Sequence, residues 1–172
     1  MALVRLLIVR HALAVPQGSR GLSDADRPLA PEGERRFRAA ARTIARLERP
    51  PHVLLTSPLV RARQTAQLLA DAWGIEPTPE PILASGNVDA VVALLERHAR
   101  DVAIALVGHE PTVSSLVIEL LGVLSSDAMA FGVGTAALLE VTTPMRRGGR
   151  LVWYLPADLA AALAGEGADG AQ

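Results

Sequence analysis

The sequence predicts an α/β fold: a three-layer α/β/α arrangement around a mostly parallel sheet, with an antiparallel edge hairpin near the C-terminus. Short aliphatic runs alternate with longer segments of helical periodicity along the chain. The strand-like runs, such as "LLIV" at 6–9, are apolar throughout, which is typical of parallel strands buried on both faces. Two later strand-like runs flank "PMRRGG", a turn sequence that favours an antiparallel hairpin.

Local signals bound the individual elements. The first helix begins with a proline, followed by Glu32 and Glu34 at the positive end of the helix dipole. Gly74 and Gly122 end two later helices. The expected strands lie at 3–9, 53–56, 102–107, 135–143 and 150–155. The expected helices lie at 31–47, 59–73, 89–98, 112–121 and 157–164.

We expect one domain over residues 1–164 and a flexible tail, "GEGADGAQ", at 165–172. A chain of 172 residues is long enough to bury one hydrophobic core. Half of the residues are hydrophobic and only 3% are aromatic, so this core must be aliphatic. The formal net charge of −1 gives no sign of a nucleic-acid partner or of a membrane-surface partner.

Missing residue types exclude several chemistries. The absence of cysteine excludes disulfides, thiolate metal sites and a cysteine nucleophile. All 17 basic residues are arginines, which excludes Schiff-base chemistry and a P-loop lysine. Arg10 and His11 interrupt the N-terminal apolar run before it reaches the roughly 7–15 residues of a signal-peptide core. Because no segment approaches the ~20 apolar residues of a membrane span, we expect a soluble, cytoplasmic protein without a membrane partner.

Three polar clusters each follow a predicted strand. Arg10 and His11 follow the strand at 3–9. Ser57 and Arg61 lie in "TSPLVRARQTA", and His109 lies in "LVGHEPT", directly after two further strands. The carboxyl ends of parallel strands meet at one edge of an open sheet, where ligand sites form. We therefore expect these side chains to converge in one crevice.

The expected crevice is rich in positive charge and hydrogen-bond donors, which suits a phosphoryl group. Arg10 and Arg61 offer planar guanidinium groups that match a tetrahedral oxyanion. Neighbouring arginines disfavour an imidazolium, so His11 should stay neutral and could attack phosphorus as a nucleophile. Arg10, Arg61 and His109 would stabilise the phosphoryl oxygens in the transition state. Ser57 either contacts the phosphate or caps the following helix.

The three clusters also resemble the motifs of a known family. "VRHA", "SPLVRARQTA" and "VGHEP", in this order, are similar to the motifs of the histidine phosphatase superfamily, whose members include the cofactor-dependent phosphoglycerate mutases. The short chain, the segment "DRPLAPEG" and the spelling "SPLVRARQTA" resemble most closely the small SixA-type phosphohistidine phosphatases. The resemblance spans residues 3–121. It implies His11 as nucleophile, Arg10, Arg61 and His109 as the phosphate pocket, and no metal or other cofactor.

The proton donor to the leaving group is the part of the family pattern that this sequence matches least. Many members carry a glutamate in a middle insertion, whereas Glu76 and Glu80 here flank a proline-rich stretch. A second branch of the family places an acid directly after the later histidine, and Glu110 holds that position. Glu110 also precedes a proline, which suits a helix start. A further departure is Ala12, where the family more often has glycine.

A phosphate pocket without a clear acid favours a substrate with a good leaving group. An alkyl phosphate gains much from a general acid, whereas the P–N bond of phosphohistidine is labile. We therefore expect a phosphatase that acts on protein phosphohistidine through a phosphohistidine intermediate on His11. One alternative is a phosphatase for small phosphorylated metabolites on the same site, and another is a non-catalytic phosphate-binding module. A metallohydrolase would need a ligand cluster that the sequence does not offer.

Two further features bear on substrate and partner. Residues 12–30 form a long connection, and structureless loops beyond about 12–15 residues are often functional. Within it, Asp24 and Asp26 either steer a substrate or, as we favour, shape turns, and Arg27 is a candidate substrate contact. The helix at 31–47 and the residues after it carry arginines spaced by three or four, which places them on one face: Arg35, Arg38, Arg42, Arg46 and Arg49. This face is either solvated or docks an acidic partner, such as a phosphorelay domain.

Overall fold

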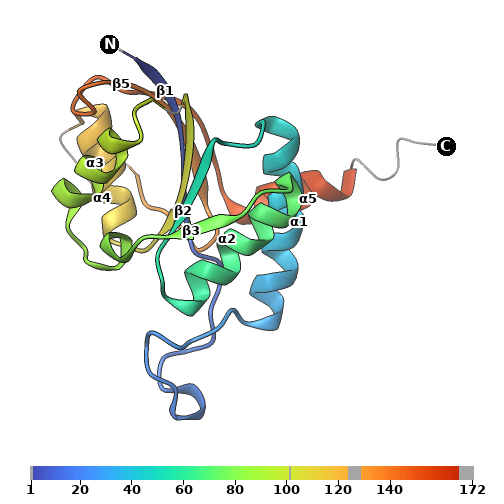
Figure 1. The fold of residues 1–172 in the computed structure, drawn as a ribbon. Coiled ribbons are helices and arrows are strands. Elements are labelled where there is room, and N and C mark those ends of the chain that lie inside the picture. Colours follow the sequence, from blue (N-terminus) through green and yellow to red (C-terminus); the bar gives the residue numbers. More distant parts are fainter. Residues whose placement is uncertain (1, 101, 124–128, 167–172) are drawn as a thin grey trace.

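The computed structural model describes residues 2–100, 102–123 and 129–166, and in this part of the chain a six-stranded mixed sheet forms the centre (Figure 1). Its strands are β1 (Leu3–Arg10), β2 (Val53–Thr56), β3 (Pro77–Pro79), β4 (Ala103–Gly108), β5 (Ala136–Thr142) and β6 (Arg150–Leu155). They lie in the order β3-β2-β4-β1-β5-β6. The neighbours among β1 to β4 pair in parallel, whereas β5 and β6 pair antiparallel. The predicted α/β fold with its antiparallel hairpin is therefore confirmed.

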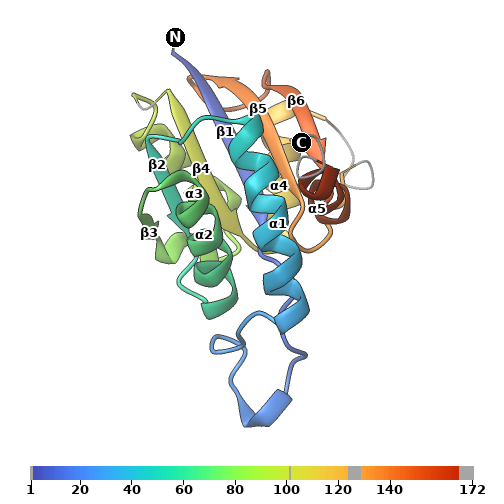
Figure 2. The ribbon, with the colours of Figure 1, turned by 90° about the vertical axis from the view of Figure 1, so that its right-hand side faces the viewer.

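Helices cover both faces of the sheet and complete three layers (Figures 1 and 2). One face carries α1 (Pro31–Leu47), α2 (Val60–Trp73) and α5 (Ala157–Glu166), and the other carries α3 (Val88–Arg97) and α4 (Thr112–Leu121). Successive side chains of β1 point to opposite faces of the sheet, and both faces are covered by helices, which explains why its sequence at 6–9 is apolar throughout. Leu6 and Ile8 pack with α3 and α4, whereas Leu7 and Val9 pack with α1 and α2. All four side chains are buried.

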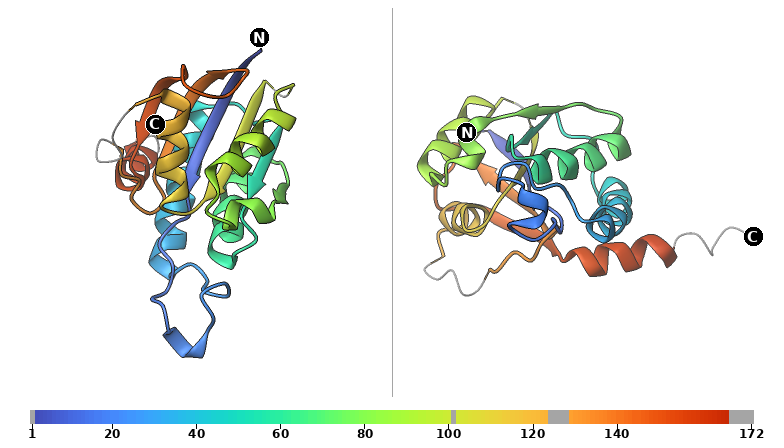
Figure 3. Two further views of the ribbon diagram at one scale, coloured as in Figure 1. Left: turned by 90° about the vertical axis from the view of Figure 1, so that its left-hand side faces the viewer. Right: turned by 90° about the horizontal axis from the view of Figure 1, so that it is seen from below.

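The loop at 12–30 projects beyond the carboxyl ends of the parallel strands (Figures 2 and 3). Its stem is a short antiparallel ladder, with a bridge between Ala14 and Leu29. Beyond that ladder the chain turns through a short 3-10 helix, Ser19–Gly21. The Val60 amide at the start of α2 donates a hydrogen bond of 3.0 Å to the Ala25 carbonyl. The loop is thus held at its stem and also where it meets α2.

The structure departs from the sequence prediction mainly at short elements. Strand β3 was not predicted, because two of its three residues are prolines; it pairs only with β2 at the sheet edge, where proline is tolerated. A 3-10 helix at Pro81–Ala84 was also missed. The last helix ends at Glu166, two residues into the predicted tail, and residues 167–172 lie outside the described residues. Among the helices described, none has the length and apolar character needed to cross a membrane.

Candidate active site

The strand register brings the three polar clusters together at the carboxyl edge of the sheet. Arg10 at the end of β1 is in register with Gly108 at the end of β4. The ladder then continues past the strands, because the His11 amide donates to Gly108 O and the Ser57 amide donates to Val107 O, each at 3.0 Å. The rings of His11 and His109 consequently lie 5.0 Å apart between centroids. The structure therefore brings these residues together, as the sequence predicts.

His11 is held as a neutral imidazole of defined orientation. Its side chain is 8% exposed, and Nδ1 lies 2.8 Å from the backbone oxygen of Ala12. Since a carbonyl can only accept, Nδ1 carries the proton and Nε2 keeps its lone pair. Burial, with smaller effects from the charges of Arg61, Arg10 and Arg27, lowers the pKa of His11 from 6.5 to about 4, although the bond to Ala12 acts in the opposite direction. The sequence interpretation assigned the neutral state to the arginines, but burial is the larger cause.

His109 is bound to Ser57 rather than to an acidic partner. Its Nε2 lies 2.7 Å from Ser57 Oγ, which in turn accepts a hydrogen bond of 3.3 Å from the Leu59 amide. Burial and the charges of His11 and Arg61 lower the pKa of His109 to about 3. Helix α2 begins at Val60 without a side-chain cap, so Ser57 does not cap this helix. Its hydroxyl instead forms hydrogen bonds both to the Leu59 amide, just before α2, and to the imidazole of His109.

The two arginines bring one buried and one partly buried cationic group to the site. Arg61, on the first turn of α2, is 6% exposed. Arg10 Nη1 donates a hydrogen bond of 2.6 Å to Phe131 O, which fixes its direction. Three buried nitrogens have no hydrogen-bond partner among the described residues: Arg10 Nε, Arg61 Nε and His109 Nδ1. Buried donors without partners are costly, which is typical of a site that an anionic ligand completes.

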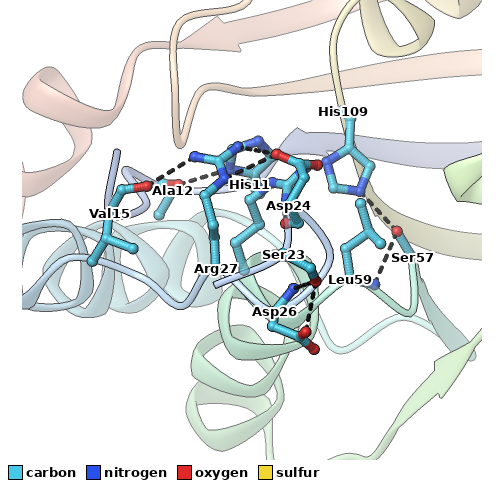
Figure 4. A network of polar contacts seen from close by, with 11 residues as sticks. His11, Ala12, Val15, Ser23, Asp24, Asp26, Arg27, Ser57, Leu59 and His109 are labelled. Carbon is cyan, nitrogen blue, oxygen red and sulfur yellow. Dashed lines mark hydrogen bonds and ion pairs between the residues drawn. The ribbon is translucent and has the colours of Figure 1, made fainter. Parts of the chain in front are cut away.

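The loop at 12–30 adds Arg27, the candidate substrate contact of the sequence, and Asp24, for which the sequence favours a turn. Arg61 donates from Nη1 to Asp24 O at 2.6 Å, and its Nη2 lies 3.0 Å from Asp24 Oδ2. Arg27 binds the other oxygen of the same carboxylate, with Nη2 2.8 Å from Oδ1. Figure 4 shows Asp24 and Arg27 in the same cluster as His11 and His109. Asp26, in contrast, binds only within the loop, at Ser23.

Glu110 lies directly after His109 and is half-buried. Its Oε1 accepts a hydrogen bond of 2.8 Å from Ser114 Oγ, one turn along on α4. Glu76 lies in the exposed chain before β3, and Glu80 is bound through its backbone to Thr56 O at 2.8 Å. Within the residues described, no group of three or more potential ligands is arranged to hold a metal ion.

Gly33, at the start of α1, explains part of the segment "DRPLAPEG". A Cβ atom at this position would lie 2.1 Å from the backbone oxygen of Leu13, two residues after His11. The same oxygen accepts a hydrogen bond of 2.9 Å from the Ala30 amide. The glycine therefore allows the loop stem to pass close to α1, and this close approach could not be read from the spacing of residues alone.

Comparison with known proteins identifies a family whose model matches part of this chain. The model of the histidine phosphatase superfamily (branch 1) matches residues 6–85, which include Arg10, His11, Ser57 and Arg61 but end before His109. An uncharacterized protein of Picosynechococcus sp. is 35% identical over 134 residues, covering 75% of this chain and 74% of its own length.

Solved structures with the same fold have different named activities. The protein histidine phosphatase SixA complexed with tungstate is 24% identical, with a TM-score of 0.79 over 90% of this chain and 97% of its own. A mycobacterial glucosyl-3-phosphoglycerate phosphatase is 19% identical, with a TM-score of 0.69 over 90% of this chain and 99% of its own. At these identities the likeness concerns the fold alone.

Proposed function

The chain belongs to the histidine phosphatase superfamily, and on this basis we propose that it is a phosphatase that hydrolyses phosphoryl groups through a covalent phosphohistidine on His11. One observation carries the proposal. Three buried nitrogens have no hydrogen-bond partner among the described residues, and they belong to Arg10 and Arg61, whose charges act on the neutral His11, and to His109, whose ring lies beside it. A tetrahedral oxyanion would satisfy all three donors, and its phosphorus would lie within reach of the imidazole.

The orientation of His11 suits nucleophilic attack from Nε2. Because Nδ1 donates to the Ala12 carbonyl, the lone pair lies on Nε2, and the same hydrogen bond stabilises positive charge that develops on the ring. The pKa of about 4 keeps the imidazole unprotonated at neutral pH. No separate base is then needed to activate the nucleophile.

The contact between Ser57 and His109 suits a tautomer of His109 that can donate to phosphate. Ser57 Oγ accepts the Leu59 amide, and we propose that it donates its own proton to His109 Nε2. The proton of His109 then lies on Nδ1, the buried atom without a partner among the residues described. We propose that this N–H donates to a phosphoryl oxygen, while Arg10 and Arg61 bind the others.

The proposed reaction has two displacements at phosphorus. Nε2 of His11 forms the new P–N bond as the bond to the leaving group breaks, and the leaving group takes up a proton. A water molecule then attacks the phosphohistidine, which releases inorganic phosphate and restores the neutral imidazole. Arginine and histidine side chains supply the charge stabilisation, so we expect activity to persist after treatment with a chelator.

A trapping experiment tests the reaction class. The wild type, His11→Ala and the control His52→Ala, an exposed histidine far along the chain, are incubated with radiolabelled phosphoramidate and quenched in base, where phosphohistidine survives. Label is expected on the wild type and on the control but not on His11→Ala. A wild type that neither becomes labelled nor hydrolyses any phosphoryl donor would instead support a non-catalytic phosphate-binding module.

We propose protein phosphohistidine as the substrate. Among the described residues, the partners of the His11 and His109 side chains are a backbone carbonyl and a hydroxyl rather than a carboxylic acid, and a P–N leaving group needs less help from an acid than an alkoxide does. The fold shared with a protein histidine phosphatase supports the same substrate class. The test compares kcat/KM for a phosphohistidine peptide with that for a simple alkyl phosphate, and faster turnover of the alkyl ester would refute the proposal.

A small phosphate ester is the second candidate, because Glu110 lies next to His109 and the fold also serves a phosphatase of a small phosphorylated molecule. In that case Glu110 would protonate the leaving oxygen. Glu110→Gln should then slow alkyl ester hydrolysis by about 100-fold or more and phosphoramidate hydrolysis little. If Glu110 serves only to bind Ser114, both substrates should respond equally weakly to the substitution.

A further inference from the structure

One carboxylate of the loop binds two arginines of the site at the same time. Asp24 Oδ2 lies 3.0 Å from Arg61 Nη2, and Oδ1 accepts hydrogen bonds from Arg27 Nε at 2.9 Å and lies 2.8 Å from Arg27 Nη2. Arg61 is 6% exposed, whereas the Asp24 side chain is 47% exposed. An otherwise buried cation of the pocket therefore meets a carboxylate that reaches it from the solvent side.

The carboxylate carries a negative charge within the pocket. Hydrogen bonds from Arg27 and Arg61 lower the pKa of Asp24, so it is ionised at neutral pH. Its charge also acts on His109, whose pKa it raises against the effect of burial. Each oxygen of the Asp24 carboxylate is bound by a different guanidinium group. A phosphoryl group could bind arginines in the same way, with one oxygen for each guanidinium group.

We propose that Asp24 is an internal competitor for the phosphoryl site: its carboxylate occupies Arg61 in the free protein, and an incoming phosphoryl group displaces it. The proposal rests on the proposed function, since it assigns Arg61 to phosphate binding. It adds a residue that sets the affinity of the site for anions and takes no part in the chemistry.

The surrounding contacts allow the carboxylate to leave while the loop stays in place. The backbone near Asp24 is held apart from the carboxylate, because Ala25 O accepts a hydrogen bond of 3.0 Å from the Val60 amide. The half-exposed side chain needs only a rotation about its own bonds to reach solvent. Arg27 is also held by the Val15 carbonyl at 2.8 Å, so it stays near His11 when Asp24 turns away.

The exchange would favour phosphoryl dianions over weaker anions and would help the product to leave. An anion that binds Arg61 through Nη2 must first break the Asp24 pair, and a doubly charged phosphoryl group gains more from the arginines than a monoanion does. Inorganic phosphate, the product, faces the same competition when the carboxylate returns. The affinity of the site for phosphate is thus lower than the arginines and His109 alone would give.

Asp24→Asn tests the proposal, with Asp26→Asn as a matched control that removes one negative charge from the same loop. Binding of inorganic phosphate is measured by calorimetry, and steady-state kinetics are measured with a phosphoramidate. Asp24→Asn is expected to lower the Kd for phosphate and the KM by several-fold, up to about tenfold, with kcat unchanged or slightly reduced. Asp26→Asn is expected to match the wild type in all three quantities.

The other outcomes each have a definite meaning. Equal phosphate affinity in Asp24→Asn and the wild type, or a raised KM, would overturn the proposal. A loss of kcat that grows with the pKa of the leaving group would make Asp24 a proton donor and would also overturn it. Asp24→Ser, which also lacks the charge, must repeat the result if Asp24→Asn unfolds at a lower temperature. A wild type that neither binds nor turns over phosphate would refute the proposed function itself.

Discussion

Thr65 Oγ1, on α2, accepts a hydrogen bond of 3.0 Å from the backbone amide of Ala12, the residue that follows His11. The same hydroxyl donates its proton to Arg61 O at 2.7 Å. Thr65 is fully buried. One side chain therefore ties the turn after β1 to the first turn of α2, and it does so between the two segments that carry His11 and Arg61.

Replacing Thr65 with valine should separate these two segments with little change in volume. The buried Ala12 amide would lose its partner, which costs about 1–3 kcal/mol of stability. Ala12 O holds the His11 ring, so kcat should fall by about tenfold or more while phosphate affinity changes less. Urea denaturation and steady-state kinetics check both effects. Thr65→Ser keeps the hydroxyl and should stay near wild type; equal activity of the two variants would contradict the assigned role.

Ser57→Ala should remove the hydrogen bond that orients the His109 imidazole and leave the contacts of Arg10 and Arg61 unchanged. The substitution removes the donor to His109 Nε2, so the imidazole no longer has a fixed tautomer and its Nδ1 proton is not guaranteed. We expect kcat to fall by about 10- to 100-fold, with a smaller change in KM. Ser85→Ala, which removes an exposed hydroxyl bound to Ile82 O, is the control. A Ser57→Ala enzyme with wild-type kcat would show that His109 does not need this partner.

Most of the site could be predicted because it follows from strand order. His11, Ser57 and His109 each follow a parallel strand, and the register of β1 with β4 and of β2 with β4 brings these strand ends together. The contribution of Asp24 was not predictable, since its partner Arg61 lies 37 positions away and the loop at 12–30 that carries Asp24 has no periodic pattern. Its neighbour Asp26 has the same residue type and a purely local role.

Two other details also depended on tertiary structure. The low pKa of His11 comes mainly from burial, which the composition of the motif does not reveal. The pairing of β3 with β2 involves prolines at a sheet edge, where local propensity argues against a strand.

Gly33→Ala should destabilise the protein although alanine favours helix. The new Cβ would meet Leu13 O at 2.1 Å, so the loop stem or the first turn of α1 must move. We expect a lower melting temperature and reduced turnover, since Leu13 follows His11 by two residues. Gly165→Ala, in α5, has open space around its Cβ and should be neutral or slightly stabilising. Thermal denaturation of both variants checks the contrast, and an equally stable Gly33→Ala would contradict it.

The two site histidines should make stability fall with acidification. Both have folded-state pKa values, about 4 and about 3, below the ordinary value of 6.5. Between 6.5 and about 4 the unfolded chain binds these protons and the folded protein does not, so the free energy of unfolding decreases as the pH falls. The slope for each histidine approaches about 1.4 kcal/mol per pH unit. Denaturant titrations across this range should show a shallower slope for His11→Asn, whereas an unchanged slope would refute the assignment.

The arginine face of α1 gives a last prediction, on the partner rather than on the reaction. Four exposed arginines lie on α1: Arg35, Arg38, Arg42 and Arg46. The predicted fifth member, Arg49, is exposed but lies beyond the end of α1 at Leu47, where Glu48 is already extended, so it does not belong to this helical face. Some of them have local contacts, since Arg38 pairs with Glu34 and Arg46 donates to Leu163 O of α5. Arg35 and Arg42 lie two turns apart on the same side, so reversing both to glutamate would change the field of the face without removing these contacts.

If the face docks an acidic phosphoprotein, Arg35→Glu/Arg42→Glu should reduce kcat/KM for that substrate by about tenfold or more and leave phosphoramidate turnover intact. The loss should shrink as salt is added, because screening weakens the attraction. Reversal of the exposed Arg97 and Arg100, at and just beyond the end of α3, makes the same change in net charge elsewhere. Equal effects on protein and small substrates, or equal effects of the two double variants, would mean that the α1 face is only solvated.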